Sequence, residues 1–159
     1  MNDAKLSKIE LIASCGMNCA ICMAYLRDKN NCVGCRGMDK DKSRYCRQCK
    51  KKNCPEIKDN NLTYCFECKQ FPCKSLKQLD KRYRTKYNMS MIENLEFIRD
   101  KGIEEFLKKE EKKWKCKTCD ALVSCHHGYC YNCESEKISK RYQLSKQKEK
   151  ETALKKDSI

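Results

Sequence analysis

The chain has 159 residues and a formal net charge of +14, with 36 Lys and Arg against 22 Asp and Glu. Apolar residues make up 40% of it, but 16 of them are cysteine, so little aliphatic and aromatic surface is left to offset the entropy cost of folding. This composition excludes a fold held by hydrophobic burial alone, and the lack of an apolar run of about 20 residues excludes a membrane-spanning helix.

The N-terminal stretch, MNDAKLSKIELIASCG, has neither the apolar run nor the small-residue cleavage site of a signal peptide. We therefore expect a cytoplasmic protein, whose thiols stay reduced. In that setting repeated C-x2-C pairs are typical of metal knuckles, not of disulfides. Cysteine binds metal as a thiolate, so each four-cysteine zinc site carries a net charge of −2, and three sites would bring +14 down to about +8.

Residues 1–73 are predicted to form a cysteine-rich metal-binding region. The run KIELIAS, within residues 1–14, alternates apolar and polar residues and predicts one short strand. Residues 15–73 hold eleven cysteines and no histidine. In AICMAYLRDKN, the positions of Ile21, Tyr25 and Leu26 indicate one face of a short helix. Elsewhere in this region we expect tight knuckle turns with little regular structure.

The cysteine pairs in this region predict two four-thiolate sites. The first comprises Cys19, Cys22, Cys32 and Cys35. The segments YCRQCKKKNC (45–54) and YCFECKQFPC (64–73) then repeat the pattern Y-C-x2-C-K-x3-C, which indicates a duplicated knuckle. The second site comprises Cys46, Cys49, Cys65 and Cys68, with Cys49, Cys54, Cys65 and Cys68 as the alternative set. Cys15, Cys54 and Cys73 are left over by the first choice; they could substitute within these sites, bridge two zinc ions, or bind a zinc with an acidic residue or water.

Residues 74–113 are predicted to form three helices. The first begins with Pro72 in its first turn. The second opens with Ser90 and Glu93 at capping-box spacing and stops at Gly102. Their apolar faces, and that of the third helix over IEEFLKKEEKKW, are assigned to the hydrophobic core. These residues are Leu76, Leu79 and Tyr83, then Ile92, Leu95 and Ile98, then Ile103, Phe106 and Leu107.

Residues 114–133 have the pattern of a zinc ribbon. Two C-x2-C knuckles separated by ten residues, the length of a β-hairpin, supply the four thiolates that tetrahedral zinc requires. The predicted ligands are Cys116, Cys119, Cys130 and Cys133. Cys125, His126 and His127 are interpreted as turn residues of the hairpin. Residues 134–159 are charged and free of glycine, which indicates a surface helix that frays into a disordered C-terminal tail.

The three cysteines of SCGMNCAIC have the C-x3-C-x2-C spacing that radical enzymes use to hold a four-iron cluster. Such enzymes need a large α/β barrel, and this chain is shorter than a barrel of about 200 residues or more and shows no strand–helix alternation. We therefore set that reading aside. An ordinary iron–sulfur cluster on four of the eleven thiols stays open as an alternative to zinc.

These elements predict a small metal-stabilised α+β fold: the cysteine-rich region (1–73), a helical segment (74–113), the zinc ribbon (114–133) and the charged tail (134–159). The segments CGMNCAIC, CVGC, YCFECKQFPC and MIENLEFIRDKGIEEFLKKEEKKWKCKTC resemble a prokaryotic family of small cysteine-rich, zinc-binding-like proteins classed as a domain of unknown function. Its signature is C-G-x2-C-x2-C, then C-x-G-C, then F/Y-P-C, and some members end in a zinc ribbon. The resemblance spans residues 10–133.

The resemblance implies metal binding, but no substrate. By position it assigns the family's cysteines to Cys15, Cys19, Cys22, Cys32, Cys35, Cys49, Cys54, Cys65, Cys68 and Cys73, with Pro72 before the last. Cys46 stands outside the family pattern, which favours Cys49 and Cys54 as the partners of Cys65 and Cys68.

We therefore expect a zinc-binding protein with about three ions, serving as a non-catalytic interaction module for a protein partner. No catalytic motif is recognised, and no catalytic or other cofactor-binding residue is assigned. An iron–sulfur, thiol-redox or metal-delivery protein is the first alternative. A zinc protein that binds nucleic acid weakly is the second, because 28 of the 36 basic residues are lysine and arginine is the better reader of bases and phosphates.

Overall fold

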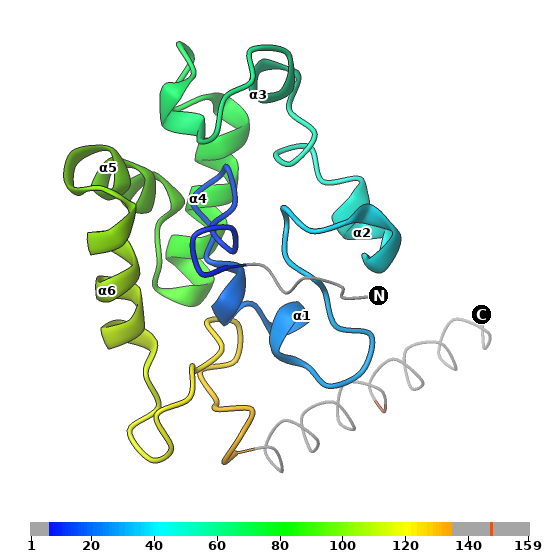
Figure 1. The fold of residues 1–159 in the computed structure, drawn as a ribbon, viewed down its shortest axis with the longest axis vertical. Coiled ribbons are helices and arrows are strands. Elements are labelled where there is room, and N and C mark those ends of the chain that lie inside the picture. The colour runs from blue at the N-terminus through cyan, green and yellow to red at the C-terminus, as the bar shows by residue number, and fades with distance from the viewer. Residues whose placement is uncertain (1–6, 135–146, 148–159) are drawn as a thin grey trace, which may run out of the picture.

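The computed structural model describes residues 7–134 and residue 147, and places three longer helices beside a set of cysteine-rich loops (Figure 1). The described 3-10 helices are η1 (Cys19–Ile21), η2 (Asp39–Asp41) and η3 (Cys65–Glu67). The described α-helices are α1 (Met23–Leu26), α2 (Arg44–Arg47), α3 (Pro55–Asp59), α4 (Lys74–Tyr87), α5 (Met91–Lys101) and α6 (Ile103–Trp114). The surface helix and disordered tail predicted beyond Glu134 lie outside the described residues, apart from residue 147.

Extended structure in the described part is limited to three isolated antiparallel bridges, which join Ile12 to Asn18, Lys115 to Leu122 and Val123 to Cys130. The strand predicted over KIELIAS is therefore wrong. The chain reverses at once after Ala13, whose N–H donates to the carbonyl of Met17 at 2.8 Å, so this segment finds no partner strand. The structure is small and mostly helical, and the β part of the predicted α+β class is not confirmed.

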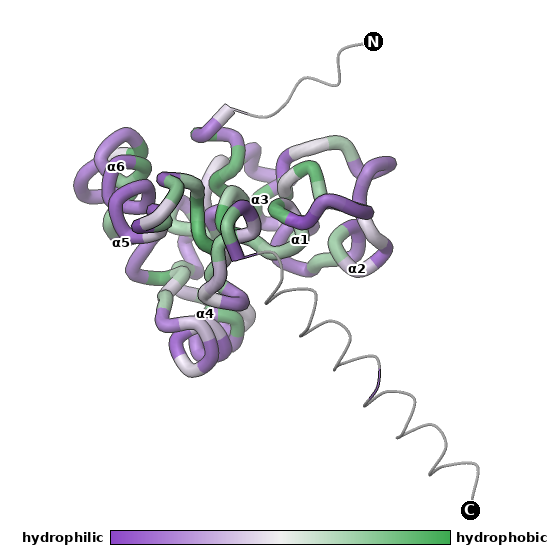
Figure 2. Tube along the Cα trace, turned by 90° about the horizontal axis from the view of Figure 1, so that it is seen from below, coloured by the Kyte–Doolittle hydropathy of each residue, from purple (hydrophilic) through white to green (hydrophobic). Residues whose placement is uncertain are grey.

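The three helices predicted over residues 74–113 are confirmed as α4, α5 and α6. α5 packs against both α4 and α6. The predicted apolar faces point inward: Leu76, Leu95, Ile98 and Phe106 are buried, and Leu79, Tyr83, Ile92, Ile103 and Leu107 pack partly buried against them. Hydrophilic residues alternate with these along the helices, as the colouring of Figure 2 shows. The helical period of the sequence was therefore a sufficient signal for this segment.

The starts of these helices agree only in part with the sequence-based predictions. α5 begins as predicted, since the Ser90 hydroxyl accepts from the Glu93 N–H at 3.0 Å. Glu93 does not complete a capping box, because its carboxylate pairs with Arg84 at 3.1 Å. Pro72 does not lie in the first turn of α4, which starts at Lys74; the bond from Phe71 to Pro72 is cis, and the proline precedes the helix.

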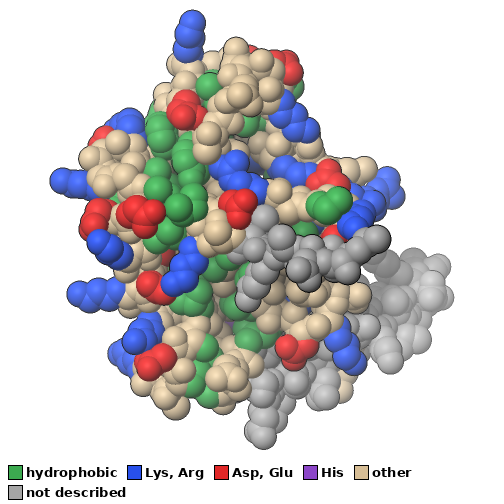
Figure 3. Space-filling model, viewed as in Figure 1, with side chains coloured by type: hydrophobic (Ala, Val, Ile, Leu, Met, Phe, Trp, Pro, Cys, Tyr) green, Lys and Arg blue, Asp and Glu red, His purple; other side chains and the backbone are tan. Residues whose placement is uncertain are grey.

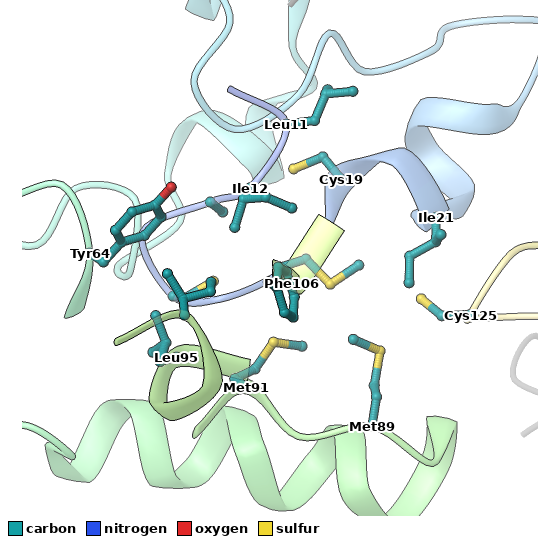
Figure 4. Close-up of a cluster of buried hydrophobic side chains, with 14 of the residues drawn as sticks. Leu11, Ile12, Cys19, Ile21, Tyr64, Met89, Met91, Leu95, Phe106 and Cys125 are labelled. Carbon is teal, nitrogen blue, oxygen red and sulfur yellow. The ribbon is translucent and has the colours of Figure 1, made fainter. Parts of the chain in front are cut away.

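One hydrophobic core joins segments that are far apart in the sequence (Figure 4). Ile12 comes from the N-terminal loop, Ile21 from η1, Phe106 from α6 and Cys125 from the predicted ribbon, and all four are buried. The predicted helix over AICMAYLRDKN is split between η1 and α1, with Ile21 in η1 and Tyr25 and the partly buried Leu26 in α1. The cysteine-rich region, the helices and the ribbon therefore share this core.

The surface is dominated by charged side chains of both signs (Figure 3). Among the described residues, no helix combines the length and the apolar composition needed to cross a bilayer. Between residues 7 and 134, the large apolar side chains that stay exposed are Ile9, Met23, Met38 and Tyr45, and the last two are 62% and 79% exposed.

Gly16, directly after the first cysteine, packs closely against α5. Its φ is +87°, and a Cβ there would lie 2.8 Å from the Met91 carbonyl oxygen and 2.9 Å from Leu95 Cγ. Gly102, between α5 and α6, has nearly the same φ of +89° but no atom within 4 Å of the corresponding position. Glycine is therefore favoured at position 16 both by the positive φ and by the lack of space for a Cβ. At position 102 only the positive φ favours it.

We expect Gly16→Ala to lower the free energy of unfolding by about 2–4 kcal/mol, because positive φ and overpacking both cost stability. Gly102→Ala should cost only about 1–2 kcal/mol, from the backbone alone. Denaturant titrations of the two variants measure the difference. Equal losses would show that the approach of this loop to α5 is not tight.

Candidate metal centres

The two knuckles predicted after α6 face each other. The chain leaves α6 at Trp114 and turns over residues 116–119, where the Cys116 N–H donates to the Ala121 carbonyl at 2.6 Å. The bridges from Lys115 to Leu122 and from Val123 to Cys130 then bring the second turn, residues 130–133, back to the first. The ten-residue connection thus acts as a hairpin with isolated bridges and no continuous strands.

The four sulfur atoms of these knuckles form a compact group, which we call the C-terminal tetrad: Cys116, Cys119, Cys130 and Cys133. All four ligand atoms lie within 4.8 Å of one another. The Sγ atoms of Cys116 and Cys133 are 3.5 Å apart, and those of Cys119 and Cys130 are 3.4 Å apart. Zinc–thiolate bonds of about 2.3 Å at tetrahedral angles place sulfurs about 3.8 Å apart. The tetrad could therefore hold one metal ion with little movement.

Backbone amides already point at the tetrad's sulfurs. The N–H groups of Thr118 and Cys119 lie at the Cys116 sulfur and lower its pKa to about 6. The Asn132 side chain does the same for Cys119, whose pKa is also lowered. The hydrogen bond with Cys116 raises the pKa of Cys133 to about 12. Such N–H to sulfur contacts stabilise thiolates, the form in which cysteine binds metal.

In the N-terminal region, the first predicted set of Cys19, Cys22, Cys32 and Cys35 has direct contacts between Cys19 and Cys35. The Cys35 N–H donates to Cys19 Sγ at 3.4 Å. The two thiols also share a hydrogen bond, which raises the pKa of Cys19 and lowers that of Cys35 to about 7. Burial raises the pKa values of Cys22 and Cys32, and each also interacts with Cys35 and with N–H groups of its own turn.

A second group of thiols surrounds Cys65. Burial raises its pKa to about 12, and the largest thiol effects on it come from Cys54, Cys73 and Cys68, in that order. Cys46 contributes instead to the raised pKa of Cys32, and Cys49 to that of Cys15. Of the three thiols around Cys65, Cys54 and Cys68 belong to the alternative predicted set, and Cys73 belongs to neither predicted set.

The N-terminal sulfurs are less tightly drawn together than the tetrad. In residues 7–134 and 147, the tetrad is the one group of three or more Cys, His, Asp or Glu with all ligand atoms within 4.8 Å. Cys15 is buried, which raises its pKa to about 12, with smaller electrostatic contributions from Cys35, Cys65 and Cys49. Cys35 and Cys65 belong to different N-terminal groups, so Cys15 interacts with both.

Cys125 and His126 are not simple turn residues, and here the sequence interpretation missed a contact. Cys125 is buried beside Ile21 (Figure 4), and its N–H donates to the Ile21 carbonyl at 3.0 Å. Burial, with a smaller contribution from Cys22, raises its pKa to about 12. The only sequence signal was that this cysteine belongs to no C-x2-C pair. The tip of the hairpin therefore rests directly on the first N-terminal group.

The His126 ring fastens the hairpin to α1 and α4. Its Nδ1 accepts from the Met23 N–H at 3.3 Å, so Nε2 carries the ring proton and donates to the Tyr83 hydroxyl at 3.1 Å. The ring also packs edge-on against Tyr87, with centroids 4.8 Å apart. Burial lowers the pKa of His126, in keeping with a neutral ring.

Residues 11–78 match the model of a family described as "Protein of unknown function (DUF3795)". The matched range covers the cysteine-rich loops and the first turn of α4, and ends before the tetrad. It overlaps the N-terminal half of residues 10–133, over which the family resemblance was expected. No curated protein and no solved structure matches the chain.

Proposed function

We propose that the protein is a non-catalytic zinc-binding module that holds about three zinc ions and binds a protein partner. The C-terminal tetrad is the observation that carries this proposal, because four thiols with sulfur contacts of 3.4 and 3.5 Å suit a single tetrahedral ion. All four positions around such an ion are filled by the protein. Closed four-thiolate sites of this kind are structural and not catalytic.

The two N-terminal zinc ions are assigned to the two thiol groups around Cys35 and Cys65. The first set is Cys19, Cys22, Cys32 and Cys35, supported by the contact of Cys35 with Cys19. The second set is Cys54, Cys65, Cys68 and Cys73, supported by the electrostatic neighbours of Cys65. Cys15, Cys46, Cys49 and Cys125 are left outside the three sites. Binding of zinc would draw each set into a closed tetrahedron.

The partner surface is proposed around Met38, directly before η2, and Tyr45, within α2. Both side chains are strongly exposed, at 62% and 79%. Aromatic residues and methionine are enriched in protein–protein interfaces, and lysine is depleted. The preference for a protein over a nucleic acid follows from the lysine-rich, arginine-poor charge of the chain.

The assignment of the tetrad is tested by Cys116→Ser in the full chain. The zinc content is expected to fall from about three to about two ions per chain, because a three-thiolate remnant binds structural zinc far more weakly. Cys125→Ser is the matched control, since Cys125 lies in the same hairpin but outside the tetrad, and it should retain all the zinc. Unchanged zinc content in Cys116→Ser, or the same loss in both variants, would refute the tetrad as a metal site.

A further inference from the structure

A cavity of about 450 Å³ lies between the N-terminal loop, the turns around Cys35 and Cys49, and α3. Its cationic lining residues are Arg36, Lys51, Lys52 and Lys58, and no Asp or Glu of the described part lines it. Three cysteines, Cys15, Cys35 and Cys49, also contribute to the lining. Lys and Arg side chains are visible on the face between α3 and α2 in Figure 3. The volume falls in the range of pockets that take small molecules.

Two of these cations already have partners that hold them in place. Arg36 Nε donates to the Ile12 carbonyl at 2.8 Å, and its Nη2 donates to the Thr63 carbonyl at 2.8 Å. Lys52 pairs with Asp39, which also receives Lys42 at 3.3 Å. Lys42 in turn donates to the Cys35 carbonyl at 2.7 Å and so lies close to the first thiol group. Lys42 and Lys52 therefore serve to balance the charge of that group.

Lys51 and Lys58 are left without an acidic partner. Neither takes part in an ion pair within residues 7–134 and 147. The Lys58 ammonium donates to the neutral Asn53 amide oxygen at 2.9 Å, which holds it without neutralising it. Two uncompensated ammonium groups and a fixed guanidinium on one concave surface attract an anion, and the walls focus their field.

The rest of the lining indicates which kind of anion fits. Ser14 and Asn61 contribute a hydroxyl and an amide, both able to hydrogen-bond an oxyanion. Ala13, Ile57 and Leu62 form an apolar wall in the same cavity. We propose that this cavity binds a phosphate monoester, with the phosphate at Lys51 and Lys58 and a small apolar organic group against Ile57 and Leu62. The cavity shares Cys35 with the first zinc set. The phosphate is proposed to contact Lys51 and Lys58 and not the metal, so this site goes beyond the proposed structural role of zinc.

The test is calorimetric titration of the full-length, zinc-loaded protein with phenyl phosphate and with inorganic phosphate. Phenyl phosphate should bind, and Lys51→Gln/Lys58→Gln should weaken it about tenfold or more, since charge-assisted hydrogen bonds are lost. Glutamine keeps most of each side chain's length, so the fold is retained, and zinc content and thermal unfolding verify this. The matched control is Lys50→Gln/Lys69→Gln, which removes the same charge from exposed positions outside the lining.

A comparison of the two ligands sharpens the outcome. Phenyl phosphate is expected to bind at least about fivefold more tightly than inorganic phosphate, because its ring buries apolar surface. No binding of phenyl phosphate to protein with full zinc content would overturn the site and leave the zinc role intact. An equal loss in the control variant would overturn it too, because binding would then reflect general charge. Inorganic phosphate binding as tightly as the ester would refute the assignment of the organic group.

Discussion

Removal of the metal is expected to abolish the cooperative unfolding transition of the protein. A structural zinc contributes about 10–16 kcal/mol of apparent binding energy. The whole stability of a domain is only about 5–15 kcal/mol. The core seen here is small, and Cys15, Cys19 and Cys125 are themselves part of it. We therefore expect the free energy that closes the cysteine-rich loops onto α4, α5 and α6 to come largely from bound metal.

The measurement is circular dichroism during heating, before and after treatment with a chelator at mildly acidic pH, where thiolates are protonated and release zinc. We expect the sharp transition to vanish and the helical signal to diminish. Re-addition of zinc at neutral pH under reducing conditions should restore both, which controls for irreversible damage. A metal-free protein with an unchanged melting curve would contradict the metal-dependent fold.

The second large effect is expected from Cys65→Ser. This residue is the centre of the second N-terminal group, so its loss should release one zinc ion and lower the thermal midpoint by roughly 10 °C. Cys46→Ser is the matched control, because Cys46 belongs to the same repeat pattern but to none of the three proposed sites. It should keep all the zinc and nearly the same midpoint.

This pair of variants also decides between the two ways of grouping the N-terminal thiols. If Cys46→Ser releases zinc and Cys65→Ser does not, the grouping around Cys65 is refuted. If both release zinc equally, the spacing-based set of Cys46, Cys49, Cys65 and Cys68 is favoured over the set that contains Cys54 and Cys73.

Local patterns in the sequence predicted the parts of the structure that are set locally. The helical spacing of Leu95, Ile98 and Phe106 predicted α5 and α6. The spacing of the C-terminal knuckles predicted the tetrad. Two facing C-x2-C pairs on a short connection have few ways to arrange themselves. The alternation in KIELIAS predicted a strand that does not form. Ile12 and its neighbours are buried because the chain turns back around Gly16, and not because they belong to a sheet.

The remaining features depend on contacts between distant segments. Nothing near Cys125 or His126 in the sequence indicates that they meet Ile21 and Tyr83, because those contacts arise from the way the hairpin folds back onto α1 and α4. The neighbours of Cys65 were equally hidden, since eleven thiols on irregular loops allow many pairings. The cationic cavity likewise combines residues from four segments, none of which forms a motif by itself.

The central claim, that this is a zinc protein with three four-thiolate sites, is tested most directly by metal analysis of protein purified without oxygen. We expect about three zinc ions per chain, no stoichiometric iron and a colourless solution. Stoichiometric iron together with a brown colour and an absorption band near about 400 nm, from thiolate-to-iron charge transfer, would contradict it.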